Sequence, residues 1–432
     1  MKKNISGYKI GVLLTIIVVN LGALILRLPH LLRTGLCDFT VYYEGTQRLM
    51  AGINPYILSS TQTTRMPVSP GFAALFSPII QLDLVSASFG LIVLDIIVLL
   101  ILYGYLYTSF IGPLPIHNHS RWTSLVWLSV GLTFFLESAP TLFALRNGQA
   151  SIIAGLFFCF SLLGRNTLWR SLALALGIII KNSLFPILII VLLLRKEFRL
   201  LGLAFIVVSM ISFFPSLWGW DLVTLHRDYT SLAISTMSSH GWNTYPKSGG
   251  DLVNMGFFLN NPMNTLLKLL TLISLIAVIW TQPKGKKPTL LVTILIVATS
   301  LSIAYHRLYD LPFLFPLLLF QIIQPTPNHR RGFQFRWIQL FFIGGYLIPQ
   351  SFILRASSII GGVVKDNPYV LIIPQQYQSS FTHLIPLYGI ITSLMVLYFS
   401  ISYWINKKRA HKKWSGSSGT AEFRNDIIAL TR

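Results

Sequence analysis

Charged residues are scarce in this sequence, and acidic residues are the scarcest. Charged side chains make up 11% of the chain, with 13 Asp and Glu against 34 Lys and Arg. Hydrophobic residues make up 53%, and the mean hydropathy is +0.65. Apolar windows of about 18 residues or more recur along the chain, and a soluble domain cannot accommodate them. The composition therefore excludes a soluble globular protein and predicts an all-α polytopic membrane protein.

The sequence also lacks the residues on which disulfide frameworks and metal centres depend. It has two cysteines, Cys37 in an expected loop and Cys159 inside an apolar run, and we expect no disulfide between them. No spacing of His, Cys and Asp suits a metal site, so none is predicted. The N-terminal MKKN is followed by an apolar run without a convincing small-residue cleavage site. We therefore expect an uncleaved membrane anchor there.

The excess of basic residues has a topological explanation. The formal net charge is +21, which in a soluble protein would indicate a nucleic-acid partner. Here the Lys and Arg residues concentrate in alternate loops between apolar runs, as the positive-inside rule predicts for cytoplasmic loops. We therefore expect membrane lipids, and not nucleic acid, to be the partners of this charge.

The apolar runs predict about twelve membrane spans. A spanning helix needs roughly 20 apolar residues, or fewer where it is short or broken. The expected spans are 8–27, 86–110, 122–143, 148–164, 168–181, 183–195, 200–217, 263–281, 289–304, 311–324, 337–354 and 383–405. The short runs 168–181 and 183–195 meet at Lys181, and broken helices of this kind tend to line a cavity. The run Phe72–Leu82 is too short to cross, so we expect a re-entrant or interfacial helix.

Twelve spans place both termini on one side of the membrane, and the basic loops predict that this side is the cytoplasm. We expect one transmembrane domain over residues 1–405, with an extracytoplasmic first loop at 28–85 and an outer segment at 218–262. Residues 406–432 are basic and then Ser/Gly-rich, and we expect a disordered cytoplasmic tail. The predicted location is a bacterial plasma membrane.

The stretch Cys37–Tyr56, CDFTVYYEGTQRLMAGINPY, gathers acid, aromatic and turn residues directly after the first expected span. A carboxylate at Asp38 is costly so close to the membrane unless it is paired or used. Two roles are open for it: a general base, or the N-cap of a helix expected over Phe39–Met50. Glu44 lies about 240° further round that helix, so we expect it to pair with Arg48 instead.

Aromatic and polar residues in the outward loops are candidate substrate contacts. Tyr42 and Tyr43 are either membrane-interface residues or platforms on which a sugar stacks. The remaining candidates lie in the Arg-Asn-Gly-Gln turn, in the outer segment and in the sequence HRLYD; they are Asn147, Gln149, His240, His306 and Asp310. Asp95, near the middle of the second span, is either a proton relay or part of a helix–helix hydrogen bond.

Cations in the same loops are candidates for binding an anion. Lys181 stands between two apolar half-helices, where a lysine either extends its ammonium to the interface or binds an anion. Arg146 and Arg307 are the other candidates. Arg307 and Asp310 are equally well explained by a plain i,i+3 ion pair.

Five stretches occur in one order along the chain, between about Asp38 and Leu319. They read DFTVYYEGTQRLMAGINPY, MPVSPGFAALFSPI, LRNGQASIIAGLFF, ALGIIIKNSLFPILIIVLLLRKEFR and AYHRLYDLPFLFPLL. The ordered set resembles glycosyltransferase family 87, polytopic enzymes of the GT-C fold. The chain departs from the family pattern in a Lys-Asn where many members carry Lys-Pro. It also has Val68-Ser69-Pro70 where a Pro-Pro pair is common.

This resemblance implies a membrane glycosyltransferase that uses a polyprenyl-phosphate-linked sugar, with mannose the best known and arabinofuranose also used. It implies a lipid or glycan acceptor, and Asp38 as general base of an inverting, direct displacement. It implies that Lys181 lies near the donor phosphate and that no metal takes part. On the residues alone, Arg307 and Arg146 are further candidates for binding the phosphate, and no cofactor is expected. Two alternatives remain at this stage: a polyprenyl-lipid transporter or flippase, and a non-catalytic subunit that binds the lipid carrier.

Overall fold

The computed structural model describes residues 36–57, 66, 68–111, 138–237, 261–283, 285–303 and 310–323, most of 129–136 and 395–405, and four isolated residues between 15 and 26. Every element in these residues is helical. The α-helices are α2 (Cys37–Met50), α3 (Pro70–Phe76), α4 (Leu84–Phe110), α6 (Ala139–Asn147), α7 (Ser151–Leu163), α8 (Thr167–Ile180), α9 (Pro186–Leu194), α10 (Phe198–Ser212), α11 (Leu222–Met237), α12 (Asn261–Trp280), α13 (Leu290–Ile303) and α14 (Leu314–Ile323). Short 3₁₀ helices are η1 (Ile79–Gln81), η2 (Asn182–Leu184) and η3 (Phe214–Trp218).

Two stretches of the described chain are long and apolar enough to cross a membrane. They are α4 and the continuous run Phe198–Trp218 formed by α10 and η3. Shorter apolar helices coincide with the expected spans around α7, α8, α12 and α13. In the residues that the structure describes, the expected all-helical fold is confirmed, and the expected number of twelve spans is not. Of the expected spans, 337–354, all but four residues of 8–27, and residues 122–128 and 383–394 lie outside the described residues, as does the tail 406–432.

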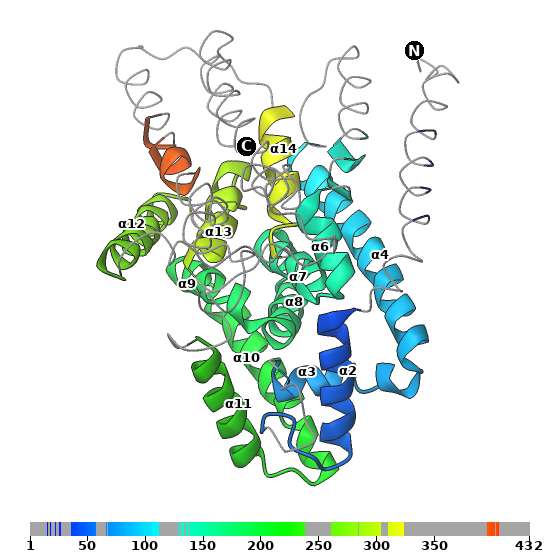
Figure 1. The fold of residues 1–432 in the computed structure, drawn as a ribbon. Coiled ribbons are helices and arrows are strands. Elements are labelled where there is room, and N and C mark those ends of the chain that lie inside the picture. Colours follow the sequence, from blue (N-terminus) through cyan, green and yellow to red (C-terminus); the bar gives the residue numbers. More distant parts are fainter. Residues whose placement is uncertain are drawn as a thin grey trace, which may run out of the picture.

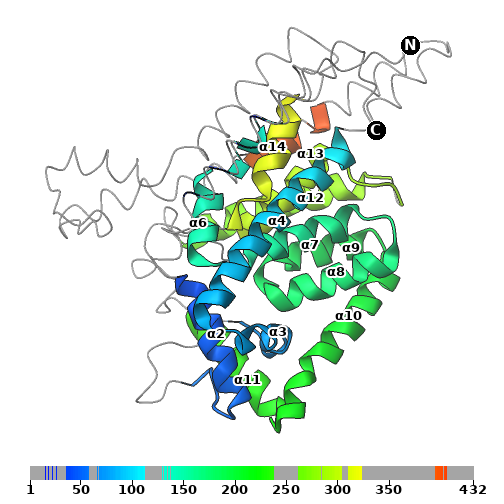
Figure 2. The ribbon, with the colours of Figure 1, turned by 90° about the vertical axis from the view of Figure 1, so that its right-hand side faces the viewer.

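The first loop forms helices of its own at one end of the molecule. In both ribbon views α2, α3 and α11 lie together at this end, and α4 and α10 run from it toward the other helices (Figure 1 and Figure 2). The expected short helix at 72–82 is α3 followed by η1, with Ser69 capping α3 through the Phe72 N–H at 3.2 Å. The described part of the first loop is therefore helical, with α2 and α3 packed together.

Four helices run between a basic end and a polar end. At the basic end, the Glu197 carboxylate after α9 pairs with Arg170 of α8 at 2.5 Å and with Arg195 at 2.9 Å. Arg195 also donates to the Lys286 carbonyl, just before α13, at 2.5 Å. Arg170 also donates to the Ser161 carbonyl of α7 at 2.7 Å, so the last turn of α7 lies here, and the 13 residues of α7 rise about 20 Å away from this end. The other ends of α7, α8, α9 and α13 therefore lie on the opposite side from the basic loops.

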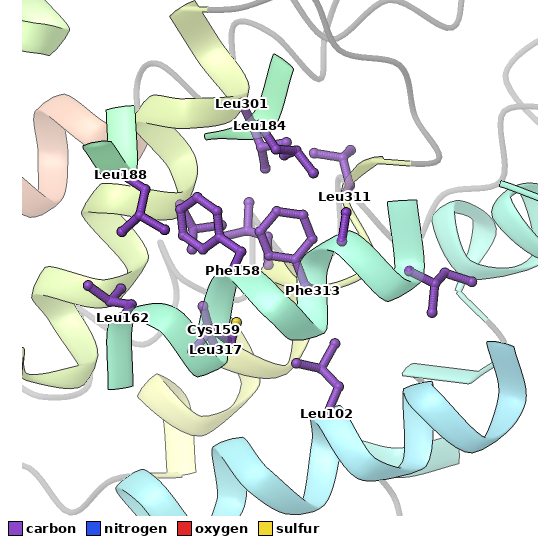
Figure 3. Close-up of a cluster of buried hydrophobic side chains, with 14 of the residues drawn as sticks. Leu102, Phe158, Cys159, Leu162, Leu184, Leu188, Leu301, Leu311, Phe313 and Leu317 are labelled. Carbon is purple, nitrogen blue, oxygen red and sulfur yellow. The ribbon is translucent and has the colours of Figure 1, made fainter. Parts of the chain in front are cut away.

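The core between these helices is built on aromatic rings. The Phe158 ring of α7 lies 5.5 Å from that of Phe185 and 5.8 Å from that of Phe313, centroid to centroid. Figure 3 shows Phe158 and Phe313 side by side, with Leu102 of α4 below them and Leu188 and Leu301 around them. Aromatic contacts of this kind add stability beyond the burial of their area. They tie the segments before α9 and α14 to α7.

Asp95 is the exception in this apolar interior. Its side chain is completely buried on α4, and neither carboxylate oxygen has a hydrogen-bond partner among the described residues. The helix–helix hydrogen bond considered for it from the sequence is therefore not found in this part of the chain. A buried polar group without a partner costs folding free energy.

Replacing Asp95 by leucine is expected to stabilise the protein by about 1–3 kcal/mol, because the cost of burying an unpartnered carboxyl group is removed. The midpoint of thermal unfolding of the purified protein in detergent measures this. Asp95→Asn is the matched variant that keeps the shape and the polarity, and it should remain close to wild type. A lower midpoint for Asp95→Leu would mean that the carboxyl group is held by favourable contacts.

Candidate functional site

Asp38 lies in the first turn of α2 and not at its N-cap. The helix begins at Cys37, so the cap residue is Leu36, which has no side-chain cap hydrogen bond. The N-cap role considered for Asp38 is therefore wrong. A carboxylate in the first turn is stabilised by the partial positive charge of the helix N-terminus. Further along α2, Glu44 and Arg48 form the expected pair, at 3.3 Å.

The turn between α6 and α7 is packed against the start of α2. Gly148 ends α6 with a φ of +63°, a left-handed conformation that favours glycine. A Cβ added there would lie 2.7 Å from the Phe39 Cβ and 3.0 Å from the Leu36 Cβ. Glycine is therefore favoured at residue 148 for two reasons: the positive φ of the backbone, and the close approach of α2 to the position of a Cβ. The turn expected from the sequence is thus confirmed, and it is held against the residues on either side of Asp38.

Gln149 follows this turn and reaches α2 with both ends of its amide. Its Nε2 donates to the Oδ2 of Asp38, and its Oε1 accepts from the Tyr42 hydroxyl at 3.2 Å. The side chain is 2% exposed. Asp38, Tyr42 and Gln149 were each candidates on sequence grounds, and the structure brings the three together.

A second polar cluster lies two residues further along the same turn. Ser151, the first residue of α7, accepts a hydrogen bond from the Lys181 ammonium at 2.8 Å. The ammonium also forms an ion pair with the Asp310 carboxylate, and the Ser151 hydroxyl donates to the same carboxylate. Asp310 is 1% exposed. Lys181 thus pairs with a carboxylate 129 residues away along the chain.

The aromatic core explains why these three side chains meet. Ser151 and Phe158 are seven residues apart on α7 and lie on the same face of that helix. Phe185 follows Lys181 by four residues and Phe313 follows Asp310 by three, and both rings pack on Phe158. Packing on one face of α7 therefore brings the break after α8 and the start of the α14 segment to Ser151.

The helix break at Lys181 is also confirmed. Helix α8 ends at Ile180, and Lys181 has an extended backbone, with φ −152° and ψ 82°, before η2 begins. Pro186 starts α9, where its missing N–H and fixed φ are tolerated. The helix is therefore broken at Lys181, whose ammonium contacts Ser151 and Asp310.

The turn 148–151 therefore joins two groups of opposite character. Gln149 contacts the carboxylate of Asp38, and Ser151 contacts the ammonium of Lys181. Residues two apart in sequence have Cα atoms no more than about 7 Å apart. One short turn thus contacts a carboxylate through one residue and a lysine ammonium through the residue two positions later. Ser151 was not among the residues predicted from the sequence; the only signal was its place two residues after Gln149.

The other predicted residues fall into two groups. Among the described ones, the Tyr43 hydroxyl donates to the Leu82 carbonyl at 2.6 Å, and the Asn147 amide donates to the Phe143 carbonyl at 2.8 Å. Arg146 is half-buried in the last turn of α6. His240, His306 and Arg307 lie outside the described residues. The possible pairing of Arg307 with Asp310 is therefore not tested.

Helix α11, in the expected outer segment, is attached to the first loop and to the helix break. The Asn54 amide donates to the Asp228 carboxylate at 2.9 Å, and the Asn182 amide donates to the Tyr229 hydroxyl at 2.7 Å. Burial, and then the neighbouring Tyr229, raise the pKa of Tyr56 well above its ordinary value. Tyr56 stays neutral and donates to the Val68 carbonyl at 3.1 Å. These contacts place α11 beside the residue that follows Lys181.

No group of three or more His, Cys, Asp or Glu side chains that could hold a metal ion occurs in the part of the chain that the structure describes. The polar groups of the site are instead one carboxylate with its amide partner and one ammonium with its carboxylate and hydroxyl partners. Such a set can accept a proton at one point and bind an anion at another.

Gly148→Ala is expected to damage both stability and activity. The substitution adds backbone strain of about 1 kcal/mol and a clash with the first turn of α2, and the clash displaces Gln149 from Asp38. Gly52→Ala is the matched control, because Gly52 has a φ of +77° but nothing within 4 Å of an added Cβ. Thermal unfolding and activity of the two variants should differ, with Gly148→Ala the worse. Equal losses would show that the close approach at residue 148 has no role.

Comparison with known proteins supplies one match. The family model for glycosyltransferase family 87 matches residues 69–304, more than half of the chain. No curated protein and no solved structure matches. Gln149, Ser151 and Lys181 lie inside the matched range, and Asp38 and Asp310 lie outside it.

Proposed function

The chain belongs to glycosyltransferase family 87, and on this basis we propose that it transfers a hexose, namely mannose, from a polyprenyl-phosphate-linked donor. The proposed acceptor is a lipid or a glycan on the extracytoplasmic face of the membrane. The observation that carries the proposal is the turn 148–151, which contacts a carboxylate through Gln149 and an ammonium through Ser151. Glycosyl transfer from a phosphate needs one group of each kind.

Asp38 is the proposed general base. As the acceptor oxygen attacks the anomeric carbon, its hydroxyl proton passes to the Asp38 carboxylate. The bond from the anomeric carbon to the phosphate oxygen breaks, and its electron pair leaves with the phosphate. Glu44, the other acid on α2, is exposed and paired with Arg48, so a single carboxylate carries out the proton transfer.

Lys181 is the proposed ligand of the donor phosphate, whose negative charge grows as the bond breaks. Its ammonium has three N–H donors and touches both Ser151 and Asp310, which hold it at the turn. Arg146, and Arg307 outside the described residues, are proposed as further phosphate ligands. Tyr42, Tyr43, Asn147, His240, His306 and Asp310 are proposed to contact or shape the space for the sugar and the acceptor.

The proposed sidedness follows from the two ends of the helices. Arg170, Arg195 and Lys286 lie at the basic end, and the positive-inside rule assigns that end to the cytoplasm. The polar clusters lie at the other ends of the same helices, so the active site faces outward. A cysteine placed in the 285–287 loop should be inaccessible to an impermeant thiol reagent added outside; labelling from outside would reverse the assignment.

The function is tested with purified wild-type protein and a panel of polyprenyl-phosphate sugars. Transfer to an acceptor, or slow hydrolysis of one donor, is the expected result. Flipping of the labelled lipid in vesicles without cleavage would instead favour a transporter. Binding of the lipid without either activity would favour a carrier-binding subunit. A transporter is the weaker candidate because the sequence contains one broken helix pair where related halves would give two.

A further inference from the structure

We infer that Gln149 is a positioning residue, which holds the Asp38 carboxylate in place for proton transfer and is itself held by Tyr42. The inference rests on the proposed function, because it assigns Gln149 a part in the same reaction. It replaces the substrate contact that the sequence predicted for this residue. Three observations lead to it: the orientation of the amide, the rigidity of its surroundings and the effect of its N–H on a carboxylate.

The amide of Gln149 has one orientation that satisfies both of its neighbours. The Tyr42 hydroxyl donates to Oε1, and Nε2 donates to the Oδ2 of Asp38. A flipped amide would direct its carbonyl oxygen at the carboxylate, so two acceptors would face each other. The tyrosine hydroxyl favours the productive orientation by donating to the carbonyl end. Both polar ends of Gln149 are thus used by protein groups.

Both partners of the amide lie on one face of α2. Asp38 and Tyr42 are four residues apart, which places their side chains one above the other on the helix. The Tyr42 ring is 7% exposed and packs on Phe72 with a centroid distance of 5.2 Å. The Tyr42 ring is therefore held in place by packing, and its hydroxyl donates to Gln149 from a fixed position.

The backbone of Gln149 is fixed as well. Its N–H donates to the Ala144 carbonyl at 3.1 Å, which closes the end of α6, and Gly148 directly before it is packed against α2. A side chain anchored at its backbone and at its carbonyl end has little freedom left. Its N–H donors are therefore held at Asp38 before substrate arrives, and this lowers the cost of organising the base during the reaction.

A donated N–H also favours the ionised carboxylate over the protonated acid. A general base must be ionised to accept a proton, so the same contact supports the reactive form. Elements α3, η1, α4 and α6 pack against α2. The carboxylates and cations on them are Asp95 and Arg146, with Asp83 at the start of α4. The variants described below leave all three unchanged.

Gln149→Met removes the donor at nearly constant volume and tests the inference directly. We expect kcat to fall about 10- to 100-fold, as for the loss of a hydrogen bond to a charged group, while the KM of the donor stays within about twofold. The acidic limb of the pH profile of kcat/KM should move to higher pH. Gln47→Met, the same change at an exposed position of α2, is the control and should behave as wild type.

Tyr42→Phe tests the second half of the inference and retains the packed ring. Losing the hydroxyl that orients the amide should lower kcat about 3- to 10-fold, as for a neutral hydrogen bond. This variant also serves if Gln149→Met does not fold.

Infrared difference spectroscopy measures the titration of the Asp38 carboxyl group without any turnover. The carboxyl band of Asp38 is identified by its absence in Asp38→Asn. In Gln149→Met its midpoint should move to higher pH.

The outcomes separate this inference from the proposed function. Wild-type protein that cleaves no donor would contradict the proposed function, and the infrared midpoint would still decide the contact between Gln149 and Asp38. An unchanged midpoint in Gln149→Met would overturn the inference. A raised donor KM with unchanged kcat in that variant would also overturn it, because that pattern belongs to a residue that binds substrate uniformly.

Discussion

Asp38→Asn is expected to lower the rate of sugar transfer by about 10²- to 10⁴-fold, the usual contribution of a positioned general base. The amide cannot take up the proton of the attacking hydroxyl, and the rest of the site is unchanged. The KM of the donor should stay close to wild type, because Asp38 acts on the acceptor side of the bond. Steady-state kinetics with purified protein and a saturating acceptor measure both values.

The chain offers a matched control for this substitution. Glu44→Gln makes the same chemical change on the same helix, at an acid that is exposed and paired with Arg48. It should keep wild-type activity, with a stability change below about 0.5 kcal/mol. Should Asp38→Asn fold and turn over as fast as wild type, the assignment of the base would be wrong.

Lys181→Met is expected to weaken donor binding about 10- to 100-fold, because a charge-assisted hydrogen bond to the phosphate is lost. It should also lower the free energy of unfolding by about 3 kcal/mol, since the Asp310 carboxylate, which is 1% exposed, loses its cation. If part of the protein unfolds, the loss of stability by itself also reduces the measured donor binding. A single substitution therefore does not separate them.

Lys181→Met combined with Asp310→Asn separates the two effects. The pair becomes neutral, so the double variant should regain most of the lost stability. Donor binding should stay weak, because the cation is still absent. Equilibrium binding of the polyprenyl-phosphate sugar and thermal unfolding give the two readings, with Lys268→Met on α12 as the control for removing a lysine elsewhere. Wild-type donor affinity in the double variant would remove Lys181 from the phosphate site.

Local sequence was sufficient for the features that depend on neighbouring residues. The helix break at Lys181 followed from two short apolar runs, and the turn at Gly148 followed from a polar Arg-Asn-Gly-Gln between apolar segments. The i,i+4 pair of Glu44 and Arg48 followed from helix periodicity. Each of these is decided within about a dozen residues, where backbone preference and hydrophobic pattern act directly.

Contacts between distant segments could not be predicted in this way. The pairing of Lys181 with Asp310 depends on two phenylalanines packing on one face of α7, and nothing near either charged residue indicates it. Ser151 was missed for the same reason. The start of α2 was misplaced because an acid before a helical pattern resembles an N-cap, whereas the helix begins at Cys37.

The length of a span was also poorly predicted by composition. A rule of roughly 20 apolar residues assumes that each helix crosses the lipid unaided. Helices α7, α8 and α9 have 13, 14 and 9 residues and are packed among other helices. Short helices of this kind are tolerated where protein and not lipid surrounds their ends. The polar clusters lie at the turn before α7 and at the break between α8 and α9.

The anomeric configuration of the product tests the proposed mechanism most directly. With one carboxylate acting as base, the acceptor must displace the phosphate in a single step, and the sugar must invert. Nuclear magnetic resonance of the product formed from a donor of known configuration gives the answer. The proposal predicts the configuration opposite to that of the donor. A product with the donor's own configuration would require a covalent intermediate or a second displacement, and it would contradict the role given to Asp38.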